Sequence, residues 1–62
     1  MKNSIVVIGG GESGVGAAYL ANKKGYNVFL SDFNTIEKKY KKILEDNQIN
    51  YEEGGHTLNK FF

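Results

Sequence analysis

The chain has 62 residues, a formal net charge of +1 at pH 7 and no cysteine. This length allows one small domain, and the lack of cysteine excludes disulfides and thiolate metal sites. The balanced charge excludes the clustered basic surface of a nucleic-acid-binding protein, and no apolar run is long enough to span a bilayer. Because residues 1–4 lead straight into an apolar run without a signal-peptide pattern, we expect a soluble cytoplasmic protein that contacts no membrane.

The first predicted strand is residues 5–8, a run of β-branched side chains that ends at three consecutive glycines. Such a run is typical of a strand that is buried on both faces of a parallel sheet. A helical pattern follows over residues 13–24. Gly25 is the expected end of this helix, because glycine readily adopts the left-handed conformation that terminates helices.

The second half of the chain repeats this order. Residues 28–30 predict a second strand, which ends at Ser31 and Asp32. Asn34 and Glu37 have the spacing of a capping box, so we expect the next helix to begin at Asn34. Its predicted apolar face consists of Ile36, Tyr40, Ile43 and Leu44, and the lysines of residues 38–42 are expected to form a solvated face.

Asn47 is the expected end of the second helix. Ile49 and Tyr51 alternate with polar residues, which predicts a third and less buried strand that is broken at Gly54. Thr57 is then expected to cap a last helix. Its apolar side would be formed by Leu58, Phe61 and Phe62, which have the i, i+3, i+4 spacing of a buried face.

Strands that alternate with helices indicate an α/β fold with a parallel sheet. Right-handed crossovers predict the strand order 3-2-1, so we expect a Rossmann-like sheet that is the incomplete half of a doubly wound domain. The first strand would be central in the complete domain. In this chain it would be an exposed edge, and we therefore expect self-association through that edge or through the C-terminal segment.

A glycine-rich loop joins the first strand to the first helix. Gly9, Gly11 and Gly14 satisfy G-x-G-x-x-G, and Asp32 follows 18 residues after the last of them, as in the dinucleotide-binding fingerprint. We expect the first glycine to permit a tight turn, the second to let backbone approach phosphates, and the third to let helix and strand pack closely. The alternative is a glycine-rich turn without a ligand.

The other polar residues near this loop each have two interpretations. Glu12 would stabilise the helix start but would also repel a pyrophosphate, and the first interpretation is preferred. Ser13 would donate to a phosphate or cap the turn. For Asp32, contact with a ribose or base is preferred over capping the next helix. His56 is interpreted as structural or solvated. No catalytic constellation and no metal cluster can be assembled, so neither kind of site is predicted.

Three segments together resemble the N-terminus of the Mur ligase family: residues 5–18, residues 24–32 and residues 53–56. The resemblance covers essentially all 62 residues. Members of this family have an N-terminal domain that holds UDP, a central ATPase domain with a P-loop, and a C-terminal domain for the incoming amino acid. The chain has no G-x-x-x-x-G-K-[ST] sequence, so residues 1–62 are expected to be part of the first domain alone.

Within the family, the resemblance is to the ligases that use ATP and Mg²⁺ to add D-glutamate to UDP-N-acetylmuramoyl-L-alanine in peptidoglycan synthesis. It implies that Glu12, Ser13 and Gly14 face the diphosphate, and that Asp32, Phe33 and Asn34 line the uracil pocket. Phe33 and Asn34 depart from the hydroxyl and basic residues that many relatives have there. Gly54 or Gly55 would lie near the nucleotide. The chain by itself would hold no cofactor and catalyse nothing.

Two other functions fit the same fingerprint. One is the NAD- or FAD-binding module of an oxidoreductase, and the other is a non-catalytic nucleotide-sensing module of the type that regulates ion transport. Sequence downstream of residue 62 would separate the three functions. A P-loop there would support the ligase, a catalytic domain with a hydride-acceptor pocket would support the oxidoreductase, and a transporter-linked tail would support the sensing module.

Overall fold

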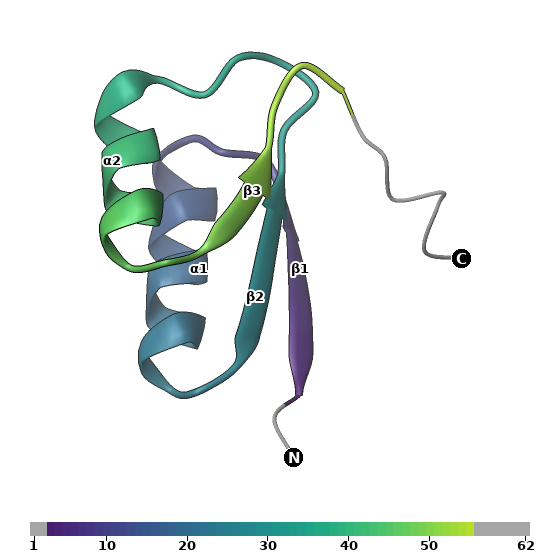
Figure 1. Ribbon diagram of the computed structural model, residues 1–62. Helices are drawn as coiled ribbons and strands as arrows, with labels where there is room; N and C mark the ends of the chain where they lie inside the picture. Colours follow the sequence, from purple (N-terminus) through teal and green to yellow (C-terminus); the bar gives the residue numbers. More distant parts are fainter. Residues whose placement is uncertain (1–2, 56–62) are drawn as a thin grey trace.

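The computed structural model describes residues 3–55 of the chain. Strands and helices alternate in the order β1 (Ser4–Ile8), α1 (Glu12–Lys23), β2 (Asn27–Ser31), α2 (Lys38–Asp46) and β3 (Asn50–Glu52). The three strands form one parallel sheet in the order β1-β2-β3, which is 3-2-1 counted from the other edge (Figure 1). The expected last helix, with His56, Thr57 and the apolar residues after them, lies outside the described residues.

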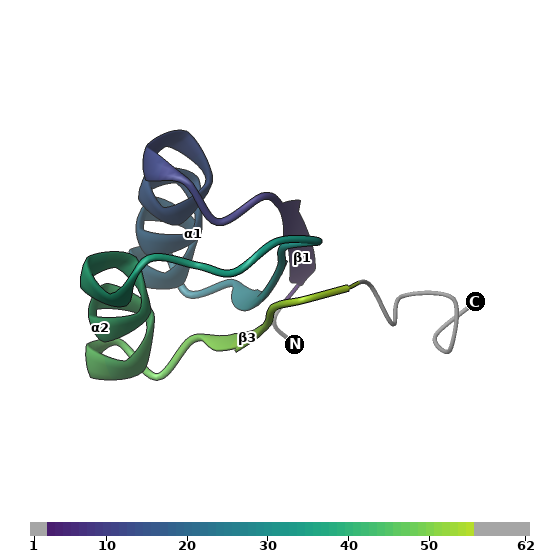
Figure 2. The ribbon, with the colours of Figure 1, turned by 90° about the horizontal axis from the view of Figure 1, so that it is seen from above.

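Both helices lie on the same side of the sheet, and the core fills the space between these two layers (Figure 2). Alternation along β2 places Val28 and Leu30 in this core. The buried apolar side chains are Val15, Ala18, Val28, Leu30, Ile36, Leu44 and Ile49. The core is therefore one-sided: within the described residues, no helix covers the second face of the sheet.

This one-sided cover corrects the expectation that β1 is buried on both faces. Ile5 and Val7 are half-buried, whereas Val6 is 46% exposed and Ile8 is 59% exposed. Val6 and Ile8 point to the face that α1 and α2 leave open, because successive strand side chains point to opposite faces. Within the described part of the chain, β1 is an edge strand, as predicted.

The expected capping box at the start of α2 is wrong. The helix begins at Lys38, and its N-cap is Glu37, which makes no side-chain capping hydrogen bond. Asn34 is held in the preceding loop because its N–H donates to Asp32 Oδ1 at 2.8 Å. Ile36, predicted on the helix, lies before it but is still buried, with 2% of its surface exposed.

The helix ends agree with the predictions. Gly25 follows the C-cap of α1 and has a φ of +92°, and Asn47 is the C-cap of α2. After Asn47, the left-handed position is taken by Gln48, whose φ is +58°. Its N–H donates to Glu45 O, and Ile49 N–H donates to Leu44 O. These bonds satisfy carbonyls that the end of a helix otherwise leaves unpaired.

Candidate functional site

The glycine-rich loop lies at the carboxyl edge of the sheet, between β1 and α1. Gly9 has a φ of +105°, which allows the tight turn, and its N–H donates to Ser31 O at 2.7 Å. A Cβ on Gly14 would lie 1.8 Å from Gly9 O. The expected roles of Gly9 in the turn and of Gly14 in close packing are therefore confirmed.

The two glycines between them differ from one another. Gly11 has a φ of −82°, and a Cβ added there would meet nothing within 4 Å. The protein itself therefore does not require glycine at this position. Gly10, which the motif leaves unspecified, is tightly enclosed: a Cβ there would lie 2.8 Å from Ile36 Cγ1 and 3.1 Å from Asp32 Oδ2.

The start of α1 offers unpaired hydrogen-bond donors. Gly11 is the N-cap, no side chain caps the helix, and the first main-chain bond runs from Val15 N–H to Gly11 O. Within residues 3–55, the N–H groups of Glu12, Ser13 and Gly14 have no acceptor. Such donors, together with the positive end of the helix dipole, favour an anion.

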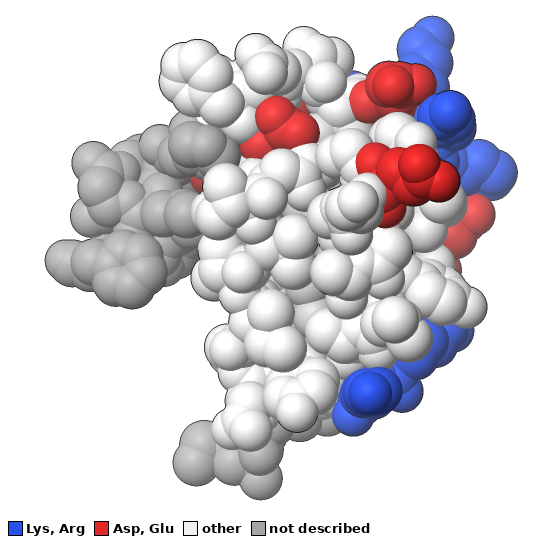
Figure 3. Space-filling view, turned by 180° about the vertical axis from the view of Figure 1, so that it is seen from behind, with Lys and Arg blue, Asp and Glu red and all other residues white. Residues whose placement is uncertain are grey.

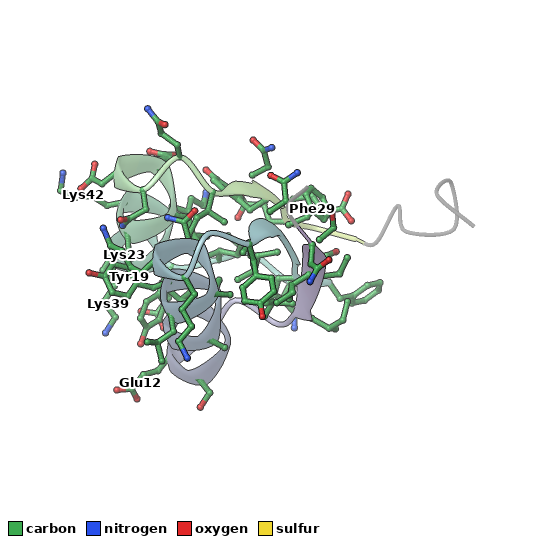
Figure 4. All side chains as sticks on the ribbon, turned by 90° about the horizontal axis from the view of Figure 1, so that it is seen from below. Glu12, Tyr19, Lys23, Phe29, Lys39 and Lys42 are labelled. Atoms are coloured by element: carbon green, nitrogen blue, oxygen red, sulfur yellow. The ribbon has the colours of Figure 1, made fainter. Side chains whose placement is uncertain are left out.

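The Glu12 and Ser13 side chains are exposed, and Glu12 projects away from the sheet (Figure 4). Glu12 borders a groove of about 620 Å³ between α1 and α2. Tyr19 and Tyr40 line the same groove, and the Nζ atoms of Lys23 and Lys39 lie 5.2 Å and 5.0 Å from their ring centroids. This groove lies between the helices and includes none of the loop glycines.

Asp32 links the glycine-rich loop to the loop after β2. Its Oδ2 accepts a hydrogen bond of 2.6 Å from Gly10 N–H, and its Oδ1 accepts one of 2.8 Å from Asn34 N–H. The alternative that Asp32 caps the next helix is wrong, because α2 begins six residues later, at Lys38. The preferred interpretation, contact of Asp32 with a ligand, stays a prediction.

The loop of residues 32–37 is also attached to the end of β3. Gly54 N–H donates to Asn34 O at 3.1 Å, and Gly55 N–H donates to Asp32 O at 3.4 Å. Between these attachments, Phe33 is 67% exposed and the Asn34 side chain is also exposed. The residues expected from the family resemblance to line a base pocket are therefore neighbours at the same edge of the sheet as the glycine-rich loop.

Glu53 makes a further attachment, which sequence reasoning missed. Its Oε1 accepts a hydrogen bond of 2.8 Å from Ile36 N–H, and its Oε2 forms an ion pair with Lys41 Nζ. The bond from Lys41 and the bond from Ile36 N–H lower the pKa of the Glu53 carboxyl below its ordinary value. No local pattern signals this role, because the partners lie 17 and 12 residues away in the chain.

The lysines of α2 are otherwise on a solvated face, as expected. Lys39 pairs with Glu37 and Lys42 pairs with Asp46, and all four side chains are at least 60% exposed. Lys41 is the exception, because it turns toward Glu53 and is only 27% exposed. Seen from behind, the lysines of the described residues gather along the helical side of the molecule (Figure 3).

Within residues 3–55, neither helix is long and apolar enough to cross a membrane. The same part of the chain holds no group of three or more His, Cys, Asp or Glu side chains placed to bind a metal ion.

Comparison with known proteins gives one consistent result. The family model of the MurD N-terminal domain matches residues 4–62. A UDP-N-acetylmuramoylalanine–D-glutamate ligase of Christiangramia forsetii is 52% identical over 62 residues, which are 100% of this chain and 14% of that protein. The ligases of the same name from Porphyromonas gingivalis and Cytophaga hutchinsonii are 58% and 43% identical, over 92% and 97% of this chain and 13% of each relative. The chain thus spans about a seventh of the length of these relatives. No solved structure matches it.

Proposed function

The chain belongs to the MurD N-terminal domain family, and on that premise we propose that it is the part of a Mur ligase that binds the UDP moiety of a peptidoglycan precursor. The observation that carries this proposal is the meeting of two loops at one edge of the sheet, where Gly10 N–H donates to Asp32 Oδ2. We further propose that the sheet is half of a Rossmann-like, doubly wound domain, in which nucleotides bind beyond the carboxyl ends of the strands.

In this proposal the diphosphate lies on the glycine-rich loop. The N–H groups of Glu12, Ser13 and Gly14 donate to phosphate oxygens, and the Ser13 hydroxyl adds a further donor. The open space at Gly11 lets the backbone approach the phosphates. Repulsion from Glu12 is reduced because its side chain projects away from the sheet, while its N–H remains at the helix start.

The uracil base then lies against the loop of residues 32–37. The Asp32 carboxylate is of the acceptor type that matches the ring N–H of uracil. The exposed ring of Phe33 supplies a stacking surface, and the Asn34 amide can both donate and accept. An aromatic ring and an amide would thus do here what a hydroxyl and a basic residue do in many relatives.

The whole protein, in this proposal, is an enzyme of the cytoplasm that adds D-glutamate to UDP-N-acetylmuramoyl-L-alanine with the energy of ATP. The relatives are named for a ligase reaction with D-glutamate. This chain has no P-loop sequence, so we assign ATP, Mg²⁺ and the catalytic groups to other parts of the ligase. We expect the 62-residue chain alone to hydrolyse no ATP.

NMR titration of the 62-residue chain with UDP, NAD and ATP tests the proposal. We expect weak binding of UDP, with chemical-shift changes at Gly11, Ser13, Asp32 and Phe33, and weaker binding of NAD. Tighter binding of NAD than of UDP, with the changes centred on Asp32, would instead favour the oxidoreductase interpretation. Absence of UDP binding at millimolar concentrations would contradict the proposal.

A further inference from the structure

The loop that carries the proposed base site has no regular secondary structure. Residues 32–37 run from the end of β2 to the start of α2 without helix or strand. A loop of this kind is ordered only by specific contacts, because fixing each backbone residue costs about 1–2 kcal/mol of conformational entropy. The contacts that order residues 32–37 therefore decide where Phe33 and Asn34 are placed.

These contacts are distributed along the loop. Asp32 Oδ1 holds Asn34 N–H at the beginning, and Gly54 N–H holds Asn34 O in the middle. At the end of the loop, Glu53 Oε1 holds Ile36 N–H over 2.8 Å. Asp32 itself is proposed to touch the nucleotide. Glu53, the residue after β3, instead contacts the loop at Ile36, three positions after Phe33.

Glu53 is well placed for this role. Its side chain is 29% exposed. Its second carboxylate oxygen, Oε2, pairs with Lys41 from the first turn of α2, and this ion pair orients the carboxylate. The residue that it holds, Ile36, is 2% exposed and packs directly beneath Gly10. Glu53 thus ties the end of β3, the start of α2 and the last part of the loop to one another.

We propose that Glu53 is a positioning residue for base recognition: by holding Ile36 N–H, it sets the loop that presents Phe33 and Asn34 to the uracil of UDP. This inference rests on the proposed function. Glu53 itself does not contact the nucleotide. The glycine-rich loop keeps its own anchor, because Asp32 Oδ2 holds Gly10 N–H, so phosphate binding is expected to be independent of Glu53.

The test compares two ligands on the 62-residue chain and its variants. UDP needs both the loop of residues 32–37 and the glycine-rich loop, whereas inorganic pyrophosphate needs only the second. We expect Glu53→Ala to raise the Kd for UDP about tenfold, the size expected for loss of a charge-assisted hydrogen bond, and to leave the Kd for pyrophosphate unchanged. A merely destabilised chain would lose affinity for both ligands.

Three matched variants sharpen the comparison. Glu53→Gln keeps an acceptor for Ile36 N–H, and Lys41→Met removes the ion pair while leaving the carboxylate in place. Both are expected to bind UDP within about twofold of the unsubstituted chain. Glu45→Ala removes a carboxylate whose partner is Tyr51 Oη, in β3, and not a residue of the loop. It is expected to change neither Kd.

The outcomes are separable. If the unsubstituted chain binds UDP and Glu53→Ala binds it equally well, the positioning role is refuted while the proposed function stands. If the unsubstituted chain does not bind UDP, the proposed function fails and this inference fails with it. If Glu53→Ala does not fold, hydrogen exchange of the amides in the unsubstituted chain tests the positioning role instead. The Ile36 N–H is expected to be protected from exchange, and to be better protected when UDP is bound. Fast exchange at Ile36 would overturn the role.

Discussion

Asp32 Oδ2 accepts a 2.6 Å hydrogen bond from the N–H of Gly10, a residue 22 positions earlier in the chain. Hydrogen bonds to an ionised carboxylate are shorter and stronger than neutral ones. The bond joins the glycine-rich loop to the loop after β2, so the proposed phosphate and base sites are held in a defined relation before any ligand binds. This preorganisation lowers the entropy cost of binding.

The first prediction concerns this bond. Asp32→Ala leaves two N–H groups, of Gly10 and Asn34, without their acceptor, and we expect a loss of about 1–3 kcal/mol in the free energy of unfolding. Urea unfolding followed by circular dichroism measures this loss. Asp46→Ala is the matched control, because among residues 3–55 its carboxylate pairs with exposed Lys42 alone and should contribute less than about 1 kcal/mol. Equal losses in the two variants would contradict the structural role of Asp32.

The second prediction separates two glycines of the motif. Gly11→Val should leave the chain folded, since its backbone is extended and its Cβ position is open, but should abolish UDP binding. Gly14→Ala should prevent folding, because its Cβ would lie 1.8 Å from Gly9 O. Calorimetry and circular dichroism measure the two effects. Unchanged UDP affinity in Gly11→Val would show that the diphosphate lies elsewhere.

The third prediction concerns the pKa of Glu53, which Lys41 and Ile36 N–H lower below the ordinary value. A carboxyl with a lowered pKa contributes stability that is present above its unfolded pKa and is lost as the pH falls through its folded pKa. We expect Lys41→Met to raise the Glu53 pKa toward the ordinary value. Carboxyl carbon chemical shifts, followed during an acid titration, measure it. The same pKa in both chains would argue against the ion pair in solution.

The fourth prediction concerns the end of α2. Gln48 has a left-handed backbone with a φ of +58°, which is unfavourable for a residue with a Cβ. Gln48→Gly should therefore raise the free energy of unfolding by about 1 kcal/mol. Gly25→Ala is the reciprocal control: its φ is +92°, so the added Cβ should lower stability. Thermal unfolding of both variants checks that Gln48→Gly gains stability and that Gly25→Ala loses it. A loss of stability in Gln48→Gly would contradict this account.

The fifth prediction concerns the edge strand. Within the described residues, β1 has a neighbour on one side alone, and Val6 is 46% exposed on the open face of the sheet. We expect the 62-residue chain to self-associate through β1, and Val6→Lys to reduce this association, because charged residues protect sheet edges. Leu20→Lys adds the same charge at an exposed position on α1 and should have no effect. Sedimentation at several concentrations measures the association. A monomer at high concentration, with the β1 amides protected from exchange, would refute it.

Much of the fold could be predicted because its signals are local. The order of strands and helices follows from the spacing of apolar residues, and the ends of α1 and α2 follow from Gly25 and Asn47. The tight turn at Gly9 and the close contact at Gly14 follow from the absence of a side chain at each position. All of these depend on residues within a few positions of one another, where sequence spacing determines geometry.

Other features were decided by the tertiary structure alone. The start of α2 was wrongly predicted because Asp32 and Gly54 hold Asn34 in a loop. Gly10 and Glu53 were missed because their partners lie 22 and 17 residues away. The exposure of β1 was misjudged because an apolar strand is buried only where another layer covers it, and both helices lie on one face of the sheet. The sequence by itself determined which elements form. Only their packing decided which carboxylates hold the loops, because hydrogen bonds between distant residues exist only once the strands are aligned.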